Sequence, residues 1–411
     1  MQEILFLCHR VPFPPDRGDK IRSHHILKRL ARIAQVHVAT FADDDFDMAE
    51  EAELAALASS YKLVRRSKPL VLAGVQALAA GQPVSLSAFR DRSIAAYVEQ
   101  VLAGRRISAI YVFSGQMGQY VPDSFGGRVI ADFVDVDSAK FEAYAAKGGG
   151  ISHWVNEREG KLLSEEETRL AMRADVSLFI AEPEARLFRS RLPEAIRDTI
   201  DVRVLPNGID SFTFDPVLVG PGTNLLDCPS PRIIFTGQMD YVPNVDAAFR
   251  VMDRILPLIH KHLPDATFHV VGRNPGEELL NRHGKDGIYV WGRVNDIRPS
   301  LKAADLALIP LDIARGVQNK VLEAMSMALP VVLTSGAASG IAAKDGRHFR
   351  IADSDDELAV AAVRLLTDHR RARIMGQAAR RFVTEHVSWQ SALSVLPELV
   401  GWRSRVMHDA A

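Results

Sequence analysis

Short apolar runs recur along this chain, and each is followed by a glycine or polar loop and then by a segment with helical periodicity. Parallel strands that are covered on both faces by crossover helices have this pattern. A first series of strands is expected at residues 4–8, 36–41, 109–113, 129–133, 176–181 and 202–205, and a second at 232–235, 267–271, 288–291, 306–310 and 331–333. The chain is therefore predicted to be an α/β protein with two doubly wound, Rossmann-like domains.

The length of the chain and one proline-rich segment set the expected domain boundaries. A chain of 411 residues fits two domains of ordinary size. Residues 214–231 contain four prolines and two glycines with little periodicity, which is typical of a linker. We expect a first domain at residues 1–213, a second at 232–388, and a C-terminal helix at 389–411 that could pack back on the first domain. The carboxyl ends of both sheets would face a central cleft, where ligands of such sheets bind.

Charge and cysteine content exclude several classes of function. Fifty basic and fifty-one acidic side chains leave almost no net charge, so no global field attracts nucleic acid. Cys8 and Cys228 lie far apart and form neither a disulfide framework nor a metal-ligand pattern, which suits a reducing compartment. The N-terminus leads directly into a strand without the features of a signal peptide, and no segment is long and apolar enough to cross a bilayer. We expect a cytoplasmic protein.

Residues 316–334 read GVQNKVLEAMSMALPVVLT and combine a loop, a helix start and a buried strand. Lys320 and Glu323 are three residues apart, so a helix places them on one face while apolar residues occupy the other. A cation in the first turn adds its charge to that of unpaired backbone N–H groups, and this arrangement binds phosphate. Glu323 could then accept hydrogen bonds from sugar hydroxyls. A pair of solvated surface charges is the alternative interpretation.

Glycines follow the strands of the second domain at positions where the backbone could approach a ligand. The loops concerned begin at Gly237, Gly272, Gly292 and Gly316. Asn244 is expected to cap the helix after the first of these loops, and Arg273 to lie near phosphates that contact Lys320. Four such loops at one edge of a sheet predict a nucleotide site.

The loop after the first strand of the chain reads HRVPFPPDRGDKIRSHH and has a single glycine. It lacks the closely spaced glycines of a dinucleotide fingerprint, so NAD binding is not expected. Gly18 and Lys20 could meet a phosphate or sugar from the other domain, and Asp19 could cap the helix. A proline-rich turn with solvated charges is an equally good interpretation.

With these motifs assembled, the chain resembles the family 4 glycosyltransferases, which are retaining enzymes with the GT-B fold and a nucleotide-sugar donor. The resemblance covers nearly the whole sequence. The motifs that carry it are PNGID at residues 206–210, the loop at 237–244, GR at 272–273, GRV at 292–294, and NKVLEAM at 319–325 continuing to PVV at 330–332. Residues 9–20, 132–138 and 316–320 are also similar to sugar transferases of bacterial exopolysaccharide clusters linked to exosortase (PEP-CTERM) sorting systems.

The resemblance implies roles for particular residues. Glu323 corresponds to the family glutamate that binds the nucleotide ribose, and main-chain groups of residues 292–294 would line the base. The donor-binding residues would be Gly237, Gln238, Asn244, Arg273, Arg293, Val294, Gly316, Asn319, Lys320 and Glu323, with Gly18 and Lys20 from the first domain.

The sequence also departs from the family pattern. Arg315 stands where many members have a second glutamate that faces the donor sugar. Gln238 and Asn244 replace the usual arginine and lysine pair in the loop after the first strand of the second domain. Two cations for the diphosphate are therefore missing, and Lys320, Arg273 and Arg315 are the available replacements.

A further departure lies in the first domain, where many members carry a histidine near the cleft. This chain has Asp135 and Asp137 in the matching region. Either aspartate could orient the acceptor, or could only stabilise a turn through its own backbone. The expected catalytic residues are thus Asp135, Asp137, Lys320 and Arg315.

The resemblance further implies hexosyl or related transfer without a metal or other cofactor. The leaving nucleoside diphosphate gains negative charge in the transition state, which cations and helix N–H groups would stabilise. The departing phosphate could take the acceptor proton, so no dedicated nucleophile is required. The acceptor would be a glycan or a polyprenyl-linked glycan. A nucleotide-sugar 2-epimerase of the same fold and a non-catalytic nucleotide-sugar-binding protein are the alternatives.

One apolar segment bears on where such an acceptor is met. Arg65, Arg66 and Lys68 precede residues 69–80, which are apolar around most of a helix. A buried helix of the first domain is the preferred interpretation. The alternative is a basic collar beside an apolar surface, which would make the protein peripheral to anionic membrane at the inner face of the cell membrane.

Overall fold

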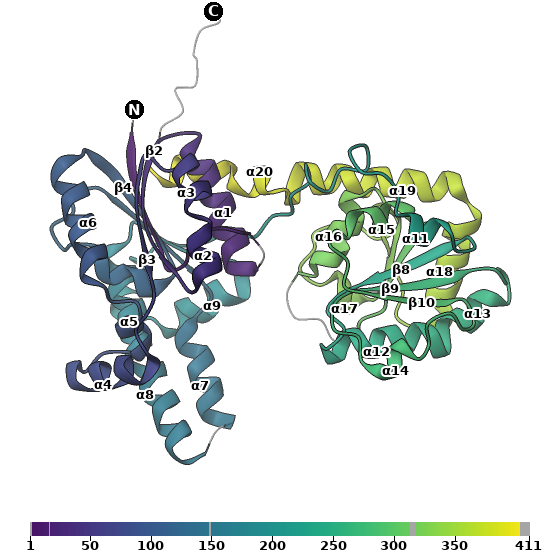
Figure 1. Ribbon diagram of the computed structural model, residues 1–411, viewed down its shortest axis with the longest axis horizontal. Helices are drawn as coiled ribbons and strands as arrows, with labels where there is room; N and C mark the ends of the chain where they lie inside the picture. The colour runs from purple at the N-terminus through teal and green to yellow at the C-terminus, as the bar shows by residue number, and fades with distance from the viewer. Residues whose placement is uncertain (1, 16, 148, 313–316, 403–411) are drawn as a thin grey trace, which may run out of the picture. The chain divides into compact units, whose positions relative to one another are not determined.

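The computed structural model describes residues 2–15, 17–147, 149–312 and 317–402. The chain forms two compact units (Figure 1). One contains the residues up to Asn207 and those from Ala392 onward, and the other contains Gly208–Ser391. The sequence places the end of the first domain at residue 213 and the start of the C-terminal segment at 389, whereas the chain leaves the first unit after Asn207 and re-enters it at Ala392. Residues 214–231, expected to be a linker, belong to the second unit.

The first unit is built on a seven-stranded sheet in which every neighbouring pair is parallel. The strand order is β3-β2-β1-β4-β5-β6-β7, so the chain changes direction across the sheet between β1 and β4. That point is the topological switch point of a doubly wound fold. The strands are β1 (Glu3–Cys8), β2 (Gln35–Ala42), β3 (Ser60–Arg65), β4 (Ile107–Phe113), β5 (Arg128–Val134), β6 (Val176–Phe179) and β7 (Val202–Val204).

Helices cover both faces of this sheet. Figure 1 shows α1 on one side of the strands and α6 on the other, and both pack against β2. The helical elements are α1 (Gly18–Ala31), α2 (Asp45–Ala49), α3 (Glu51–Leu57), α4 (Leu70–Ala80), α5 (Val84–Ala88), α6 (Arg92–Gly104), the 3-10 helix η1 (Gly115–Tyr120), α7 (Asp137–Lys147), α8 (Gly150–Arg173), α9 (Glu182–Arg191) and α10 (Glu194–Arg197). After the chain returns, η4 (Leu393–Val395) and α21 (Leu396–Leu399) belong to the same unit, and α21 packs against α1.

The second unit has a six-stranded sheet with the same plan. Its order is β10-β9-β8-β11-β12-β13, all pairs are parallel, and the switch point lies between β8 and β11. The strands are β8 (Arg232–Thr236), β9 (Thr267–Val271), β10 (Ile288–Gly292), β11 (Leu306–Ile309), β12 (Val331–Leu333) and β13 (Arg350–Ile351). The central strands are almost wholly buried, which explains their unbroken apolar sequences.

The helices of the second unit alternate with these strands and continue beyond them. They are α11 (Thr223–Leu226), α12 (Val242–Arg250), α13 (Leu256–His260), α14 (Glu277–Leu280), α15 (Arg298–Ala303), α16 (Asn319–Ser326), α17 (Ser335–Ala338), α18 (Asp355–Thr367), α19 (His369–Phe382) and α20 (Trp389–Ala392), with π-helical turns η2 (Val251–Ile255) and η3 (Val383–Val387). Gly208 packs on the start of α20, where a Cβ would lie 2.4 Å from the Trp389 nitrogen. This contact accounts for the glycine of the PNGID segment.

Helix α4 corrects one expectation from the sequence. Ala73 and Ala77 are fully buried, but the larger apolar residues Leu72, Val75 and Leu78 are exposed. The interpretation of this segment as a buried helix is therefore wrong, because the small residues face the protein and the large ones face outward. Arg158 of α8 holds the end of α4 by donating to the carbonyl oxygen of Ala77 at 3.2 Å.

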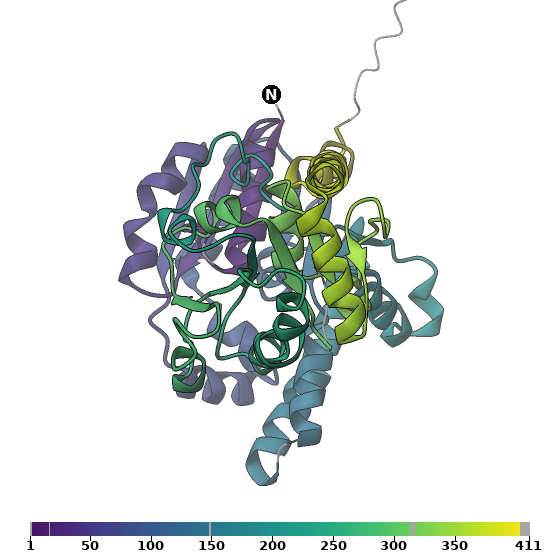
Figure 2. The same cartoon turned by 90° about the vertical axis from the view of Figure 1, so that its right-hand side faces the viewer.

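The neighbouring helices α7 and α8 pack along each other as a hairpin, and Figure 2 shows it projecting from the rest of the first unit. The hairpin is joined to α5 by Glu159, whose carboxylate accepts from the backbone nitrogens of Val84 and Ser85 at 2.7 and 2.8 Å. These two N–H groups lie in the first turn of α5, where they have no partner within the helix. Among the described residues, no helix has both the length and the apolar character needed to span a membrane.

Candidate functional site

A pocket with a volume of about 530 Å³ lies at the carboxyl edge of the second sheet. Its walls come from the loops after β8, β9 and β10 and from the start of α16, the helix that follows β11. It therefore lies at the switch point between β8 and β11, where open α/β sheets bind their ligands. The lining residues are Thr236, Gly237, Gln238, Tyr241, Asn244, Val271, Gly272, Arg273, Arg293, Val294, Ile297, Val317, Gln318, Asn319, Lys320 and Glu323.

The structure thus brings together every described residue of the second unit that the sequence assigns to donor binding. Gly237, Gln238, Asn244, Arg273, Arg293, Val294, Asn319, Lys320 and Glu323 all line this pocket. Gly316 and Arg315, which the sequence also assigns to the site, lie outside the described residues. Glycine at strand ends was the signal that located these loops from the sequence alone.

Two of the glycines allow the loops to touch. A Cβ on Gly272 would lie 1.6 Å from the carbonyl oxygen of Gly237, so the two backbones cross with no room for a side chain. A Cβ on Gly237 would lie 2.8 Å from Asn244 Nδ2 and 3.0 Å from Lys320 Nζ. The loops are also joined by the Met239 nitrogen, which donates to the carbonyl oxygen of Arg273 at 2.8 Å. Close backbone approach is what lets such a pocket follow a diphosphate.

Lys320 is the cation at the centre of the pocket. It is the second residue of α16, and its ammonium group donates to Asn244 Oδ1 and lies 4.6 Å from the centre of the Phe235 ring. No carboxylate lies within ion-pair distance of Lys320 among the described residues. Its charge is therefore supported by an amide, an aromatic face and the helix start instead of by a counterion.

The protonation of Lys320 and Glu323 reflects this shortage of partners. Burial lowers the pKa of Lys320 to about 8, against the attraction of Glu323. Burial raises the pKa of Glu323 to about 7, against the attraction of Lys320. Both shifts have the sign of desolvation, which disfavours the charged form of each group. A bound ligand with a negative diphosphate and free hydroxyls would stabilise the ammonium group and supply donors to the carboxylate.

Arg273 forms the other basic wall. Its guanidinium group donates to Gln238 Oε1 at 2.8 Å, and its side chain is exposed to the pocket. Gln238 thereby holds the guanidinium group in place beside its own loop. Asn244 does not cap the following helix as expected, because α12 begins two residues earlier, at Val242. It instead accepts from Lys320 and donates from Nδ2 to the carbonyl oxygen of Gln238 at 2.9 Å.

Lys20, which the sequence assigns to the donor site, is buried in the first unit and bound to other residues of that unit. It is 2% exposed, pairs with the buried Asp47, and donates to the carbonyl oxygen of Phe13 at 2.9 Å. A phosphate would have to break this ion pair to reach the ammonium group, so the expected phosphate contact of Lys20 does not fit the structure. Gly18 begins α1, and a Cβ there would meet nothing within 4 Å, so no close approach requires glycine at this position.

Asp135 and Asp137 lie together at the carboxyl end of β5. Lys140 donates to both, at 3.0 Å in each case, and Gln116 donates to Asp137 at 3.2 Å. Val134 precedes them with a φ of 71°, and the Asp135 nitrogen donates to the carbonyl oxygen of Phe133 at 2.9 Å. A β-branched residue in this left-handed turn is strained, and such strain is concentrated at functional sites.

The first unit contains a charge network that the sequence did not reveal. Arg10, after β1, binds Asp19 at 2.9 Å and Asp43 at 2.7 Å, and His9 lies 3.4 Å from Asp19. Asp19 is therefore held by these contacts. The sequence suggested that Asp19 could cap α1, but its side chain makes no capping hydrogen bond. Burial lowers the pKa of His9, whose ring stacks on Phe113. Asp43 follows β2, whereas the other members follow β1, so the network depends on tertiary structure and not on a local motif.

A second network is fully buried. Arg22 is 1% exposed and binds both oxygens of Asp132 at 3.1 Å. Tyr111 donates to the same carboxylate at 2.8 Å, and Arg22 also donates to Asn207 Oδ1 at 2.8 Å. Burial raises the pKa of Tyr111 well above its usual value. A buried pair with all of these hydrogen bonds serves the fold, since losing one partner would leave the other charge unpaired.

Comparison with known proteins shows what this part of the chain is similar to. Residues 230–368, which contain the pocket, match the model of the family described as "Glycosyl transferases group 1". Within the described residues, no group of three or more His, Cys, Asp or Glu side chains could hold a metal ion. The expectation of a reaction without metal or cofactor stays a prediction.

Two curated proteins share sequence with the chain. A GDP-mannose-dependent alpha-(1-6)-phosphatidylinositol monomannoside mannosyltransferase of Mycolicibacterium smegmatis is 27% identical over 261 residues, which are 57% of this chain and 64% of that protein. An MMP alpha-(1->4)-mannosyltransferase of Mycolicibacterium hassiacum is 27% identical over 197 residues, or 46% of each chain. The matches thus span less than two thirds of these relatives. Together with the family, they support the prediction of a glycosyltransferase enzyme.

The fold is shared with solved structures. The crystal structure of Anabaena HepE in complex with UDP and glucose has a TM-score of 0.57 and 14% sequence identity, covering 97% of this chain and 99% of that one. The predicted fold class, two doubly wound parallel-sheet α/β domains as in GT-B glycosyltransferases, is confirmed.

Proposed function

We propose that this chain is a retaining glycosyltransferase that moves a sugar from a nucleoside diphosphate sugar to a glycan or lipid-linked glycan in exopolysaccharide synthesis. One observation carries the proposal. Lys320 and Glu323 lie on one face of α16, both line the pocket at the switch point of the second sheet, and both have a pKa shifted against the charged form. A diphosphate would stabilise the charged form of Lys320, and the hydroxyls of a ribose would donate hydrogen bonds to Glu323.

The reaction class follows from where charge develops. When the bond between the sugar and the phosphate breaks, negative charge grows on a phosphate oxygen and positive charge on the sugar ring. Lys320 and Arg273, which line the same pocket, would stabilise the phosphate, and the start of α16 would add its backbone N–H groups. Glu323 would accept hydrogen bonds from the ribose. Arg315 is proposed as a third cation, on the resemblance alone.

Retention is proposed to occur on the face from which the diphosphate leaves. The departing phosphate oxygen would take the proton of the acceptor hydroxyl, so that this chain need only hold the donor and orient the acceptor. Asp135 and Asp137 are proposed for the acceptor, and the strained turn at Val134 supports this choice because it fixes their direction. One of the two relatives is described as GDP-mannose-dependent, and HepE was solved with UDP. A nucleoside diphosphate hexose is accordingly proposed here.

An assay without acceptor tests this function. The protein is incubated with UDP-glucose or GDP-mannose, and thermal stabilisation and donor products are measured. The proposal expects stabilisation by at least one donor and transfer once a glycan acceptor is added. Conversion of the donor to its 2-epimer would establish the epimerase instead. Tight binding with neither hydrolysis nor transfer across a broad acceptor panel would establish a non-catalytic binding protein.

The exposed face of α4 supports a lipid-linked acceptor met at a membrane. Leu72, Val75 and Leu78 are 47%, 59% and 54% exposed, and no residue from 70 to 82 is charged. An exposed apolar face of this kind is costly in water and is stabilised at a lipid surface. The adjoining basic residues contribute less than expected, because Arg65 pairs with Asp45 and Arg66 pairs with Asp43. Lys68 donates to two backbone carbonyl oxygens.

Co-sedimentation with phosphatidylglycerol–phosphatidylcholine vesicles tests the membrane contact. Leu72→Ser combined with Leu78→Ser should abolish sedimentation while leaving the melting temperature nearly unchanged, since both side chains are exposed. Val360→Ser, at an exposed apolar residue of the second unit, is the matched control and should sediment like the wild type. Sedimentation that survives the loss of the leucines would remove α4 from the contact.

A further inference from the structure

A second pocket of the second unit has no part in the donor site. It has a volume of about 600 Å³ and lies beside the edge strand β13, between that strand and helices α18 and α19. It shares no lining residue with the donor pocket. Its residues are Arg350, Ile351, Ala352, Asp353, Asp356, Glu357, Val360, Ala361, Arg364, Leu365, Arg371 and Met375.

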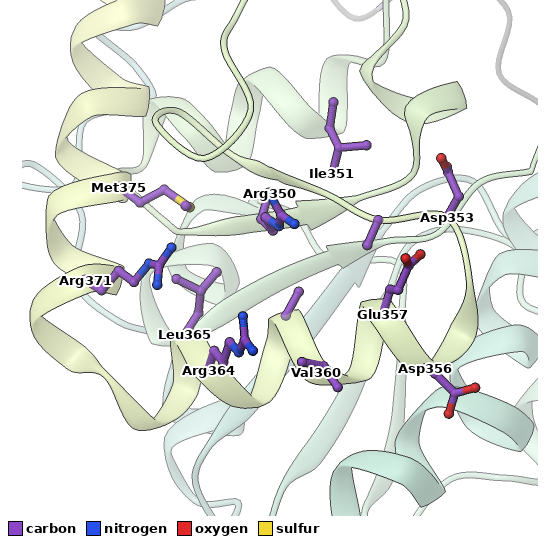
Figure 3. Close-up of a pocket in the computed structure, with 12 residues that line it drawn as sticks. Arg350, Ile351, Asp353, Asp356, Glu357, Val360, Arg364, Leu365, Arg371 and Met375 are labelled. Carbon is purple, nitrogen blue, oxygen red and sulfur yellow. The ribbon is translucent and has the colours of Figure 1, made fainter.

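The basic and the acidic side chains of this pocket lie at opposite ends of it. Figure 3 shows the guanidinium groups of Arg364 and Arg371 reaching from two helices toward one space beside Leu365, with Arg350 of β13 close by. The carboxylates of Asp353, Asp356 and Glu357 lie at the other end. Apolar side chains occupy the floor between the two ends. A ligand that fits must therefore carry negative charge at one end and hydrogen-bond donors at the other.

The two ends differ in how far their charges are already satisfied. In the part of the chain that the structure describes, neither Arg364 nor Arg371 has an ion-pair or hydrogen-bond partner for its guanidinium group. Arg350 is bound to Asp345 at 2.9 Å and forms a fixed wall. Arginine presents a planar fork of donors that matches a phosphate or carboxylate. Two such groups beside an apolar floor form an incomplete anion site.

The acidic end is fixed by its own contacts. Asp353 accepts from the backbone nitrogen and hydroxyl of Ser335 at 2.8 and 2.9 Å, and Glu357 accepts from the hydroxyl of Ser354 at 2.9 Å. The Asp353 carbonyl oxygen also accepts from Arg250 at 2.6 Å. Oxygens held in this way accept sugar hydroxyls without reorganising, and each carboxylate has lone pairs to spare.

We propose that this pocket binds a saccharide that carries a phosphate or carboxylate group, with the anion on Arg364 and Arg371 and the hydroxyls at Asp353 and Glu357. The volume suits one or two sugar rings, since small-molecule sites span roughly 300–1,000 Å³. The inference does not rest on the proposed function, because no residue of the donor pocket takes part.

Isothermal titration calorimetry tests the site on the full-length Lys320→Ala protein, in which the donor pocket has lost its central cation. Mannose 6-phosphate, glucuronic acid, mannose and inorganic phosphate are the probes. Binding of mannose 6-phosphate or of glucuronic acid at least tenfold tighter than both mannose and phosphate supports the proposal and shows which anion the site takes. Equal binding of phosphate and the charged sugars, or binding of none of the four, overturns it.

Variants locate the binding. Arg364→Gln with Arg371→Gln should weaken the charged sugar by at least tenfold, since each lost charge-assisted contact accounts for a factor of that order. Arg373→Gln removes an exposed arginine of α19 that does not line the pocket, and it should change the dissociation constant by less than about twofold. Equal weakening by Arg373→Gln would show a non-specific attraction to the basic helix and would overturn the assignment.

Discussion

Lys140 and Lys320 both lie near the start of a helix at the carboxyl edge of a parallel sheet, one in each unit, and they differ in their partners. Lys140 donates to the carboxylates of Asp135 and Asp137, which raise its pKa although burial acts to lower it. Lys320 has an amide and an aromatic ring, and burial lowers its pKa to about 8. The same topology therefore gives a cation paired with two carboxylates and a cation that has no carboxylate partner among the described residues.

The contrast extends to the rest of each edge. In the first unit, Arg10, Lys20 and Arg22 each bind a carboxylate from another part of the chain. Among the described residues of the donor pocket, Arg273 donates to the amide oxygen of Gln238 and Lys320 to that of Asn244, and neither has an ion-pair partner. An amide orients a cation without cancelling its charge. The edge of the second unit is therefore suited to an anionic ligand. At the edge of the first unit, the cations are already paired with carboxylates of the chain.

The largest expected effect concerns the buried pair of the first unit. Asp132→Ala leaves Arg22 charged and unpaired in the core and should lower the free energy of unfolding by about 3–5 kcal/mol. Denaturant unfolding measures this, and the affinity of the second unit for UDP or GDP should be unchanged. Asp201→Ala breaks the exposed pair with Arg203 and should cost less than about 1 kcal/mol. Equal losses for the two variants would show that burial does not set the difference.

Removing the proposed ribose contact should have an intermediate effect. Glu323→Ala deletes the carboxylate that faces the pocket and should lower kcat/KM on the order of tenfold, mainly through KM, as expected for a contact made equally in the ground and transition states. Glu323→Gln should retain part of the activity, because its amide oxygen still accepts a hydrogen bond. Glu277→Ala, on an exposed helix outside the pocket, is the control. Steady-state kinetics with unchanged activity in Glu323→Ala would remove this residue from the donor site.

A smaller effect is expected from pH. In the free protein Lys320 loses its proton as the pH rises through about 8, whereas a bound diphosphate favours the charged form. Affinity for UDP or GDP should therefore be highest near pH 7, begin to decline as the pH approaches 8, and fall several-fold by pH 9.5. Calorimetry at pH 7, 8, 9 and 9.5 measures this, and Lys320→Ala should be flat over the same range. A wild-type affinity that is flat as well would contradict the role of this lysine.

The parts of the molecule that the sequence predicted are those set by local pattern. Buried strands such as β1 and β9 are unbroken apolar runs, so their positions were found to within a residue or two. The edge strands β3 and β13 were missed, because β3 is half-exposed with a mixed sequence and β13 has only two residues. Edge strands are paired on one side only, and their sequences are correspondingly less constrained.

The same division applies to the candidate site. Glycine at strand ends and the spacing of Lys320 and Glu323 are local signals, and they assembled into one pocket. The partner of Lys20 is 27 residues away and that of Arg22 is 110 residues away, so their pairing depends on tertiary structure. Helix α4 was also predicted wrongly, because an apolar composition does not say which face of a helix is buried.

The central claim is that Lys320 is the phosphate ligand of the second unit and that Lys140 has no such role. Calorimetric titration of UDP and GDP into Lys320→Ala and Lys140→Ala at pH 7 tests both halves together. We expect Lys320→Ala to weaken binding of the preferred nucleotide by tenfold or more with an unchanged melting temperature, and Lys140→Ala to bind it like the wild type. Wild-type affinity in Lys320→Ala, or an equal loss in both variants, would contradict the claim.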